Sequence, residues 1–142
     1  MPLIKNPIPN KKFYSILQQM GVLVPGGQIS RKQVYSILGA VIPTMLTHQE
    51  CSEVKTMLIG PIDYVRRALL AQGMYFAQEK GNYRVYKLEE NVHAVKAYAR
   101  RARNSCIRGQ TLNDNTPAQY MKNQQANTKI FDQCINLLAK VS

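Results

Sequence analysis

The most informative stretch of the sequence lies between residues 73 and 88 and reads GMYFAQEKGNYRVYKL. Aromatic and β-branched residues stand on both sides of Lys80-Gly81, in partial alternation with polar ones, while the flanking segments have helical spacing. A two-residue connection that ends in glycine is typical of a tight hairpin, because glycine adopts the positive φ that such turns require. We therefore predict two short strands with Gly81 in the turn, inside an otherwise helical chain.

Alternation along the two strands predicts which side chains face the helices. Tyr75, Tyr83 and Val85 are expected on the core side. The opposite side and the tip then carry positive charge, supplied by three basic residues, namely Lys80, Arg84 and Lys87. A basic loop is expected to project beside the helices.

The residues before the hairpin predict two short helices that meet at a corner. Thr47 and Glu50 form a capping box, in which the hydroxyl and the carboxylate each satisfy a main-chain N–H at the start of a helix. Gly60-Pro61 is expected to end that helix and start the next, because glycine permits a sharp turn and proline is tolerated at a first helical position. The second helix buries Ile62, Val65 and Leu69 and ends at Gly73.

Two further helices are expected upstream. Ser30 and Gln33 form a capping box that opens RKQVYSILGAVI, and Pro43 closes this helix. Residues 1–29 are interpreted as a separate amphipathic helix followed by a turn, because apolar residues recur at helical spacing after Asn10 and Gly21 supplies a left-handed stop.

The predicted order of elements from about Ser30 to Leu88 resembles that of the winged helix-turn-helix family of nucleic-acid-binding domains. This order is a helix, a tight turn, a second helix and a basic hairpin. The resemblance rests on the Thr47–Glu50 box, on Gly60-Pro61 at the turn, on Tyr64–Gln72 as the recognition helix and on Glu79–Asn82 at the wing tip. It implies a mainly α fold with a small β-hairpin, in which residues 30–88 are the winged helix-turn-helix core and additional helices lie on both sides.

The resemblance also implies a mechanism, because a helix fits the major groove of duplex DNA and its outward side chains reach base edges. Arg67 points outward and is expected to contact a guanine, with Tyr64 and Arg66 on sugar and phosphate. Lys11-Lys12 and Arg31-Lys32 stand at two helix starts against the helix dipole, which suggests an anionic partner nearby. The DNA-binding residues expected are therefore Tyr64, Arg66, Arg67, Lys80, Arg84, Lys87, Arg31 and Lys32.

Residues 89–142 are expected to form a helical extension. Its long helix runs to Gly109, and a polar loop then leads to a last helix that starts at Thr116-Pro117. Small apolar residues recur along the long helix at steps of three and four, a heptad-like seam that predicts a homodimer. The predicted dimer seam consists of Val92, Val95, Ala99 and Ala102. The basic residues beside it, Lys96, Arg100 and Arg103, either follow a phosphate backbone or solubilise the rim of the seam.

Charge and composition narrow the function. The 142 residues include 19 Lys and Arg against 8 Asp and Glu, a net charge of +11 that favours a polyanionic partner. No apolar run is long enough for a membrane span, and Cys51, Cys106 and Cys134 lie too far apart for a disulfide framework or a metal site. We expect a cytoplasmic protein without cofactor or metal. We expect no enzymatic activity, because no catalytic grouping or phosphate-binding loop is present.

The leading hypothesis is a duplex-DNA-binding transcriptional regulator. A second is a protein-binding module of a mobile element, such as a phage or plasmid, that docks on the nucleic-acid machinery of its host. A third is a replication or recombination accessory with little sequence preference. The salt dependence of DNA binding distinguishes the DNA-binding hypotheses from the protein-docking one.

Overall fold

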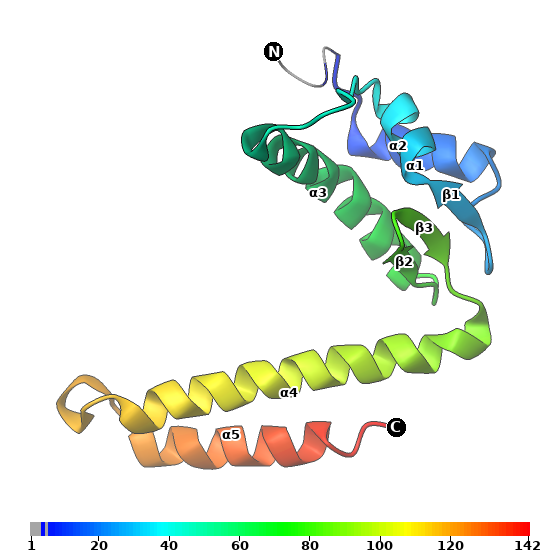
Figure 1. Ribbon diagram of the computed structural model, residues 1–142. Helices are drawn as coiled ribbons and strands as arrows, with labels where there is room; N and C mark the ends of the chain where they lie inside the picture. Colours follow the sequence, from blue (N-terminus) through cyan, green and yellow to red (C-terminus); the bar gives the residue numbers. More distant parts are fainter. Residues whose placement is uncertain (1–3, 5) are drawn as a thin grey trace. The chain divides into compact units, whose positions relative to one another are not determined.

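The computed structural model describes Ile4 and residues 6–142, and the chain divides into two compact units, unit 1 up to Glu89 and unit 2 from Glu90 (Figure 1). The elements before the division are α1 (Asn10–Gln19), β1 (Gln28–Ser30), α2 (Arg31–Leu38), α3 (His48–Leu70), β2 (Phe76–Glu79) and β3 (Asn82–Val85). A short 3-10 helix, η1 (Leu88–Glu90), is followed by α4 (Asn91–Asn115), η2 (Ala118–Tyr120) and α5 (Gln124–Leu138). A mainly helical chain with a small β element is therefore confirmed.

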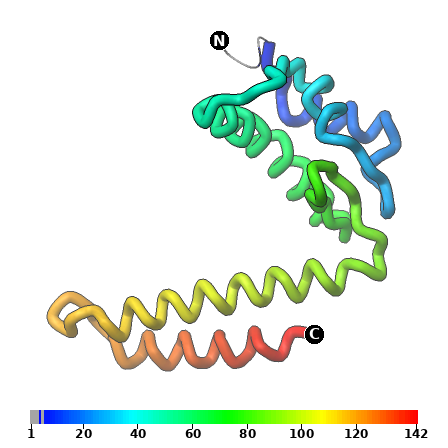
Figure 2. Tube along the Cα trace, viewed as in Figure 1, coloured from blue at the N-terminus to red at the C-terminus, as the bar shows by residue number. Residues whose placement is uncertain are grey.

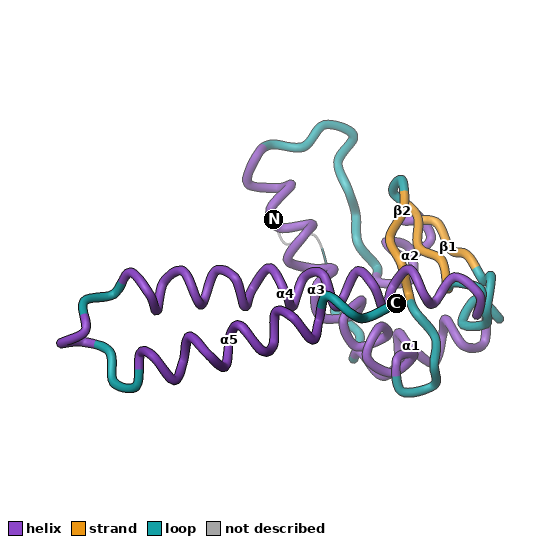
Figure 3. The backbone as a smooth tube through the Cα atoms, turned by 90° about the horizontal axis from the view of Figure 1, so that it is seen from below, coloured by secondary structure: helices purple, strands orange, loops and turns teal. Residues whose placement is uncertain are grey.

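The predicted hairpin is present and has gained a third strand. β2 and β3 pair antiparallel, and the two turn residues both have positive φ, 48° at Lys80 and 80° at Gly81. β1 pairs antiparallel with the other edge of β3, with Ile29 opposite Tyr83, which gives the strand order β1-β3-β2 (Figure 3). The segment before Ser30 was predicted as a brief extended piece and a turn, and its pairing with the hairpin was not predicted, because three residues are too few to show alternation.

The core side of the hairpin differs from the prediction at one position. Tyr83 and Val85 are buried as expected, but on β2 it is Phe76 that is buried, and Tyr75 is only half-buried. The ring of Phe76 stacks on that of Tyr83, with 5.4 Å between centroids and 7° between planes. Tyr75 instead lies against Tyr86, with 4.9 Å between the ring centroids.

The predicted corner at Gly60-Pro61 is wrong, because α3 is one continuous helix of 23 residues that contains Pro61. A proline inside a helix costs about 3 kcal/mol, since it removes the hydrogen bond to the carbonyl four residues earlier and crowds that turn. The buried side chains of α3 keep helical spacing across the proline: Val54, Leu58, Ile62, Val65 and Leu69. Burying each such side chain is worth about 1.5–3 kcal/mol, so a single straight stripe outweighs the cost of Pro61.

The two predicted capping boxes are present. The Ser30 hydroxyl accepts from the N–H of Gln33 at 3.2 Å, and the Thr47 hydroxyl accepts from the N–H of Glu50 at 3.2 Å. The helix that Ser30 opens ends earlier than expected, at Leu38, because Gly39 adopts the left-handed conformation with φ of 68°. Val41 consequently lies outside the helix and is 74% exposed.

The hydrophobic core of unit 1 includes the segment that the sequence analysis had set apart. Phe13 and Leu17 of α1 are fully buried, and α1 packs against α3. Leu23 and Ile29 join the same cluster as the buried residues of α2, α3 and the sheet. Residues 10–30 are thus part of unit 1.

In unit 2, α4 continues through Gly109 to Asn115, so the predicted helix end at Gly109 and the polar loop after it are wrong. α4 and α5 lie side by side and run antiparallel, as Figures 2 and 3 both show. A Cβ placed on Gly109 would come within 2.9 Å of Cζ of Phe131 on α5. This glycine is inside a helix because the ring of the neighbouring helix occupies the space of a side chain.

The last helix begins at Gln124, and only the short 3-10 turn η2 follows Thr116-Pro117, where the helix was expected to start. The polar run 123–129 forms the first part of α5, and its contact with α4 is made by hydrogen bonds. The buried amide of Asn113 donates to the carbonyl of Gln124 and to the hydroxyl of Thr128, both at 3.1 Å. In return, the Gln124 amide donates to the carbonyl of Asn113 at 2.6 Å.

Candidate nucleic-acid interface

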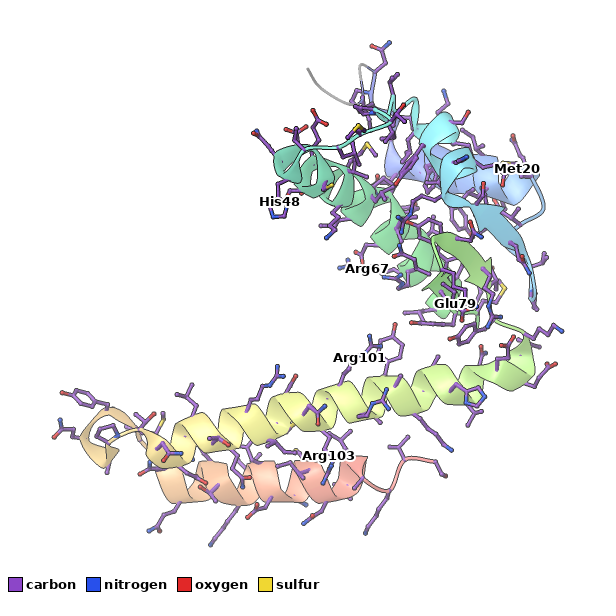
Figure 4. All side chains as sticks on the ribbon, viewed as in Figure 1. Met20, His48, Arg67, Glu79, Arg101 and Arg103 are labelled. Carbon is purple, nitrogen blue, oxygen red and sulfur yellow. The ribbon has the colours of Figure 1, made fainter. Side chains whose placement is uncertain are left out.

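The outward side of α3 carries the most exposed of its predicted contact residues. Arg67 lies opposite the buried stripe, and 80% of its side chain is exposed. Its Nε is 2.9 Å from Oδ2 of Asp63, one turn earlier on the same helix. Figure 4 shows the Arg67 side chain leaving α3 on the side away from the core. An ion pair with this spacing is worth only about 0.3–0.5 kcal/mol on a surface helix, so the guanidinium remains available to a partner.

Arg66 does not share that side with Arg67, whereas Tyr64 adjoins it and borders a groove together with Asp63 and Arg67. Tyr64 lies on one flank of α3, where its ring meets Tyr14 of α1 edge-on with 6.1 Å between centroids. Arg66 lies on the other flank, and its Nε donates a hydrogen bond to the carbonyl of Phe76 at 3.2 Å. Of the three α3 residues predicted to meet the DNA groove, Tyr64 and Arg67 therefore lie on neighbouring parts of the surface, and Arg66 lies on the opposite flank against the hairpin.

The hairpin tip presents Lys80, which is exposed and adopts a left-handed conformation. Arg84, two residues into β3, is bound to Glu79 by two contacts, Nε to Oε2 at 2.8 Å and a terminal nitrogen to Oε1 at 3.1 Å. Its guanidinium also lies over the ring of Tyr86, 4.6 Å from the centroid. The charge of Arg84 is thus largely neutralised inside the hairpin, whereas Lys80 is exposed at its tip.

A cleft of about 420 Å³ opens between α2, α3 and the hairpin, within unit 1. Arg31 enters it from the start of α2, and Lys55 and Arg66 enter it from α3. Of the described residues that line it, Asp63 alone is acidic. The remaining lining residues are apolar, aromatic or amide side chains: Tyr35, Val54, Leu58, Ile59, Ile62, Gln78 and Tyr83.

Arg31 and Arg66 are half-buried, whereas Lys55 is exposed. Arg31 lies near the Tyr83 side chain, and its Nε is buried without an acceptor among the described residues. Burial raises the pKa of Tyr83 above its ordinary value, while the nearby charge of Arg31 opposes this rise. The neighbouring Lys32 is exposed and lies outside the cleft.

Lys55 and Tyr35 were not predicted as site residues from the sequence, and neither was the cleft itself. Lys55 and Arg66 are eleven residues apart, a spacing of three helical turns that places them on one flank of a continuous helix. That signal was lost when the helix was divided at Gly60-Pro61. The contact of Arg31 with Tyr83 joins residues far apart in the chain and leaves no local pattern.

In unit 2, α4 carries five basic residues: Lys96, Arg100, Arg101, Arg103 and Arg108. Arg101 points away from α5 and its guanidinium lies 4.6 Å from the centroid of the Tyr98 ring, whereas Arg103 points towards α5 (Figure 4). Nε of Arg103 is buried without an acceptor in the part of the chain that the structure describes. Arg101 therefore lies on the opposite side of α4 from Arg103.

The predicted seam residues lie on the first half of α4. Val92 is 40% exposed and Val95 is 50% exposed, Ala102 is exposed and Ala99 is partly exposed. Further along the same stripe, Gly109 and Asn113 contact α5 of the same chain. The second half of the stripe thus packs against α5 of the same chain, and the first half, with the predicted seam residues, is accessible.

Among the described residues, no group of three or more His, Cys, Asp or Glu side chains is placed to hold a metal ion, and the three cysteines are free thiols. No described helix combines the length and the apolar character that crossing a membrane requires. Comparison with protein-family models, with curated proteins and with solved structures gave no match to this chain.

Proposed function

We propose that this protein binds duplex DNA and regulates transcription in the cytoplasm, and that unit 1 is a winged helix-turn-helix domain whose two helices are α2 and α3. The order of helix, connection, helix and hairpin fits α2, residues 39–47, α3 and the β2–β3 pair. In this arrangement α3 is the recognition helix and Lys80 is at the tip of the wing. The connection between the two helices is the segment 39–47, which is longer than the tight turn expected at Gly60-Pro61. Gly60-Pro61 itself lies within α3.

The observation that carries the proposal is the exposed Arg67 on a long helix whose other side is buried. A helix fits the major groove, and a guanidinium there can bond both acceptors of a guanine, which is worth about 1–3 kcal/mol of discrimination. Asp63 holds Arg67 by one nitrogen at 2.9 Å and so limits its rotamers before binding. The same outward side of α3 carries the acidic residues Glu53 and Asp63 together with polar ones, so Arg67 is the residue there that can face a base edge with a positive charge.

Contacts with phosphates are assigned to basic residues on three elements around α3. Lys32 lies at the start of α2, Lys55 on α3 and Lys80 at the hairpin tip, and all three are exposed. Such contacts contribute affinity without sequence preference. Arg84 has no part in this assignment, because Glu79 already binds it through two contacts.

A homodimer formed through α4 is part of the same proposal. Val92 and Val95 are accessible apolar residues on α4, and Ile130 and Leu137 on α5 are 58% and 57% exposed. Dimeric helix-turn-helix proteins bind two half-sites about one helical turn apart, so the target would be partly palindromic. Light scattering of the purified protein at several concentrations tests the dimer directly.

The function is tested by incubating the purified full chain with a pool of random duplexes, recovering the bound molecules and determining the enriched motif. The proposal is supported if the wild-type protein enriches a motif that contains a guanine and if Arg67→Ala no longer selects that guanine. The matched control is Lys140→Ala, which removes an exposed charge in unit 2. Binding of every duplex alike supports the accessory role instead, and a lack of any complex at low salt supports the protein-docking role.

A further inference from the structure

We propose that the cleft between α2, α3 and the hairpin binds a nucleoside monophosphate, with the phosphate among Arg31, Lys55 and Arg66 and the base over the apolar lining. This assignment goes beyond the proposed function and does not depend on it, since the cleft residues would serve a small ligand whether or not α3 enters a DNA groove.

The charge of the cleft matches a phosphate monoester. Arg31, Lys55 and Arg66 contribute three positive charges, and Asp63 contributes one negative charge that is already shared with Arg67 at 2.9 Å. The remaining charge of about two is complemented by a phosphate monoester, which carries about −1.5 to −2 at pH 7. A phosphodiester has one charge and would leave the cleft positively charged.

Arg31 is prepared to donate to such a group. Its guanidinium lies near the Tyr83 side chain, and its buried Nε finds no acceptor among the described residues. Buried polar groups are almost always hydrogen-bonded, and phosphate oxygens accept from guanidinium in a planar, charge-assisted geometry. Arg66 is likewise fixed at the edge of the cleft, because its Nε is bound to the carbonyl of Phe76.

The apolar lining requires a ligand with a body as well as a charge. Val54, Leu58 and Ile62 are buried side chains that reach the cleft, and Ile59 beside them is 65% exposed. A phosphate of intact duplex DNA would leave these carbons in water. A flat base would cover them and lie beside Tyr35, and a volume of about 420 Å³ is within the range of small-ligand pockets.

A nucleoside monophosphate can reach the cleft from two sources, as a free nucleotide or as the 5′-phosphorylated end of a strand. The four free ribonucleoside 5′-monophosphates, and a tetranucleotide with and without a 5′-phosphate, are titrated separately into the full chain. Binding is measured by calorimetry and by the amide NMR shifts of Lys55, Ile59 and Gln78. Inorganic phosphate and adenosine are titrated as the two halves of the ligand.

We expect one nucleotide per chain, shifts confined to the cleft, and affinity at least tenfold above that of phosphate or adenosine alone. Lys55→Gln and Arg31→Gln should each weaken nucleotide binding by about tenfold, as expected for loss of a hydrogen bond to a charged group. Lys12→Gln, which removes an exposed charge elsewhere in unit 1, should leave it unchanged. Preference for the phosphorylated tetranucleotide over free nucleotides would assign the strand end as the source.

The inference is overturned if no nucleotide or phosphorylated tetranucleotide binds, if Lys55→Gln and Lys12→Gln have equal effects, or if phosphate alone binds as tightly as the nucleotides. Arg31→Gln could unfold unit 1, which the NMR spectrum would show, and Lys55→Gln then decides because Lys55 is exposed. If the protein binds a duplex but no nucleotide, the nucleotide site is refuted and the proposed function stands. If the protein binds a nucleotide but no duplex, the nucleotide site stands and the proposed function is refuted.

Discussion

Nε of Arg66 on α3 lies 3.2 Å from the carbonyl oxygen of Phe76, the first residue of β2. This hydrogen bond fixes the hairpin against the flank of the helix at the point where the chain returns from α3. Phe76 is buried and stacks on Tyr83, so the same contact positions both strands relative to α3. Arg66 is therefore a positioning residue for the hairpin as well as part of the cleft lining.

Replacing Arg66 with alanine should lower the free energy of unfolding of the protein by roughly 1–2 kcal/mol, because a partly buried carbonyl loses a charge-assisted donor. Urea denaturation followed by circular dichroism measures this change. Arg67→Ala is the control, since an exposed pair one turn apart contributes about 0.5 kcal/mol or less. Equal losses in the two variants would contradict the positioning role of Arg66.

Replacing Glu79 with glutamine should release Arg84 from its two carboxylate contacts and so strengthen duplex binding at low salt. The expected result is a log–log dependence of affinity on salt that is steeper by about one unit, the contribution of one more neutralised phosphate. Fluorescence anisotropy of a labelled duplex across a salt series provides the measurement. Glu89→Gln makes the same change of charge outside the hairpin strands, and a slope that rises as much in that variant would refute the explanation.

Replacing Gly109 with alanine should destabilise unit 2, because the new Cβ would lie 2.9 Å from Cζ of Phe131. Alanine favours a helix over glycine by about 1 kcal/mol, but overpacking costs typically 1–3 kcal/mol. We expect a lower midpoint of thermal unfolding for Gly109→Ala, and recovery in the double variant Gly109→Ala with Phe131→Leu. A stabilised single variant would show that α4 and α5 do not pack this closely.

Tyr83 should ionise above the ordinary pKa of a tyrosine, because burial raises its pKa and the charge of Arg31 only partly opposes this. Since the unfolded chain would release this proton near the ordinary value of 10.0, the contribution of Tyr83 to stability is complete below pH 10 and is lost as the pH rises through its higher pKa. In a titration of tyrosinate absorbance, Tyr83→Phe should remove the most alkaline component. A most alkaline component that persists unchanged in Tyr83→Phe would contradict the buried position of Tyr83.

Local chemistry in the sequence was sufficient for the parts of the fold that depend on neighbouring residues. The Ser30 and Thr47 capping boxes and the Lys80-Gly81 turn each act within a few residues, and all three are present as predicted. The predicted corner at Gly60-Pro61 was wrong because the local preference of these residues for a turn is weaker than the apolar stripe that continues through them. The periodicity was visible in the sequence and should have outweighed the proline.

Contacts between distant segments could not be predicted in the same way. β1 is recognisable only through its pairing with β3, and Gly109 through its contact with Phe131. The cleft depends on Arg31 meeting Tyr83, and no spacing rule connects those positions. Among the predicted DNA contacts, the outward position of Arg67 follows from helical periodicity in the sequence. The binding of Arg84 by Glu79 could not be predicted, because it depends on the register of the hairpin.

The central claim is that α3 recognises duplex DNA through Arg67, and the most direct measurement is competition between a selected duplex and a shuffled duplex of the same composition. We predict that the wild-type protein prefers the selected duplex and that both complexes weaken with rising salt. Arg67→Ala should lose about tenfold or more of the preference, the effect of about 1–3 kcal/mol, while binding of the shuffled duplex stays nearly unchanged. Equal binding of both duplexes by the wild-type protein, or a preference that survives in Arg67→Ala, would contradict the account.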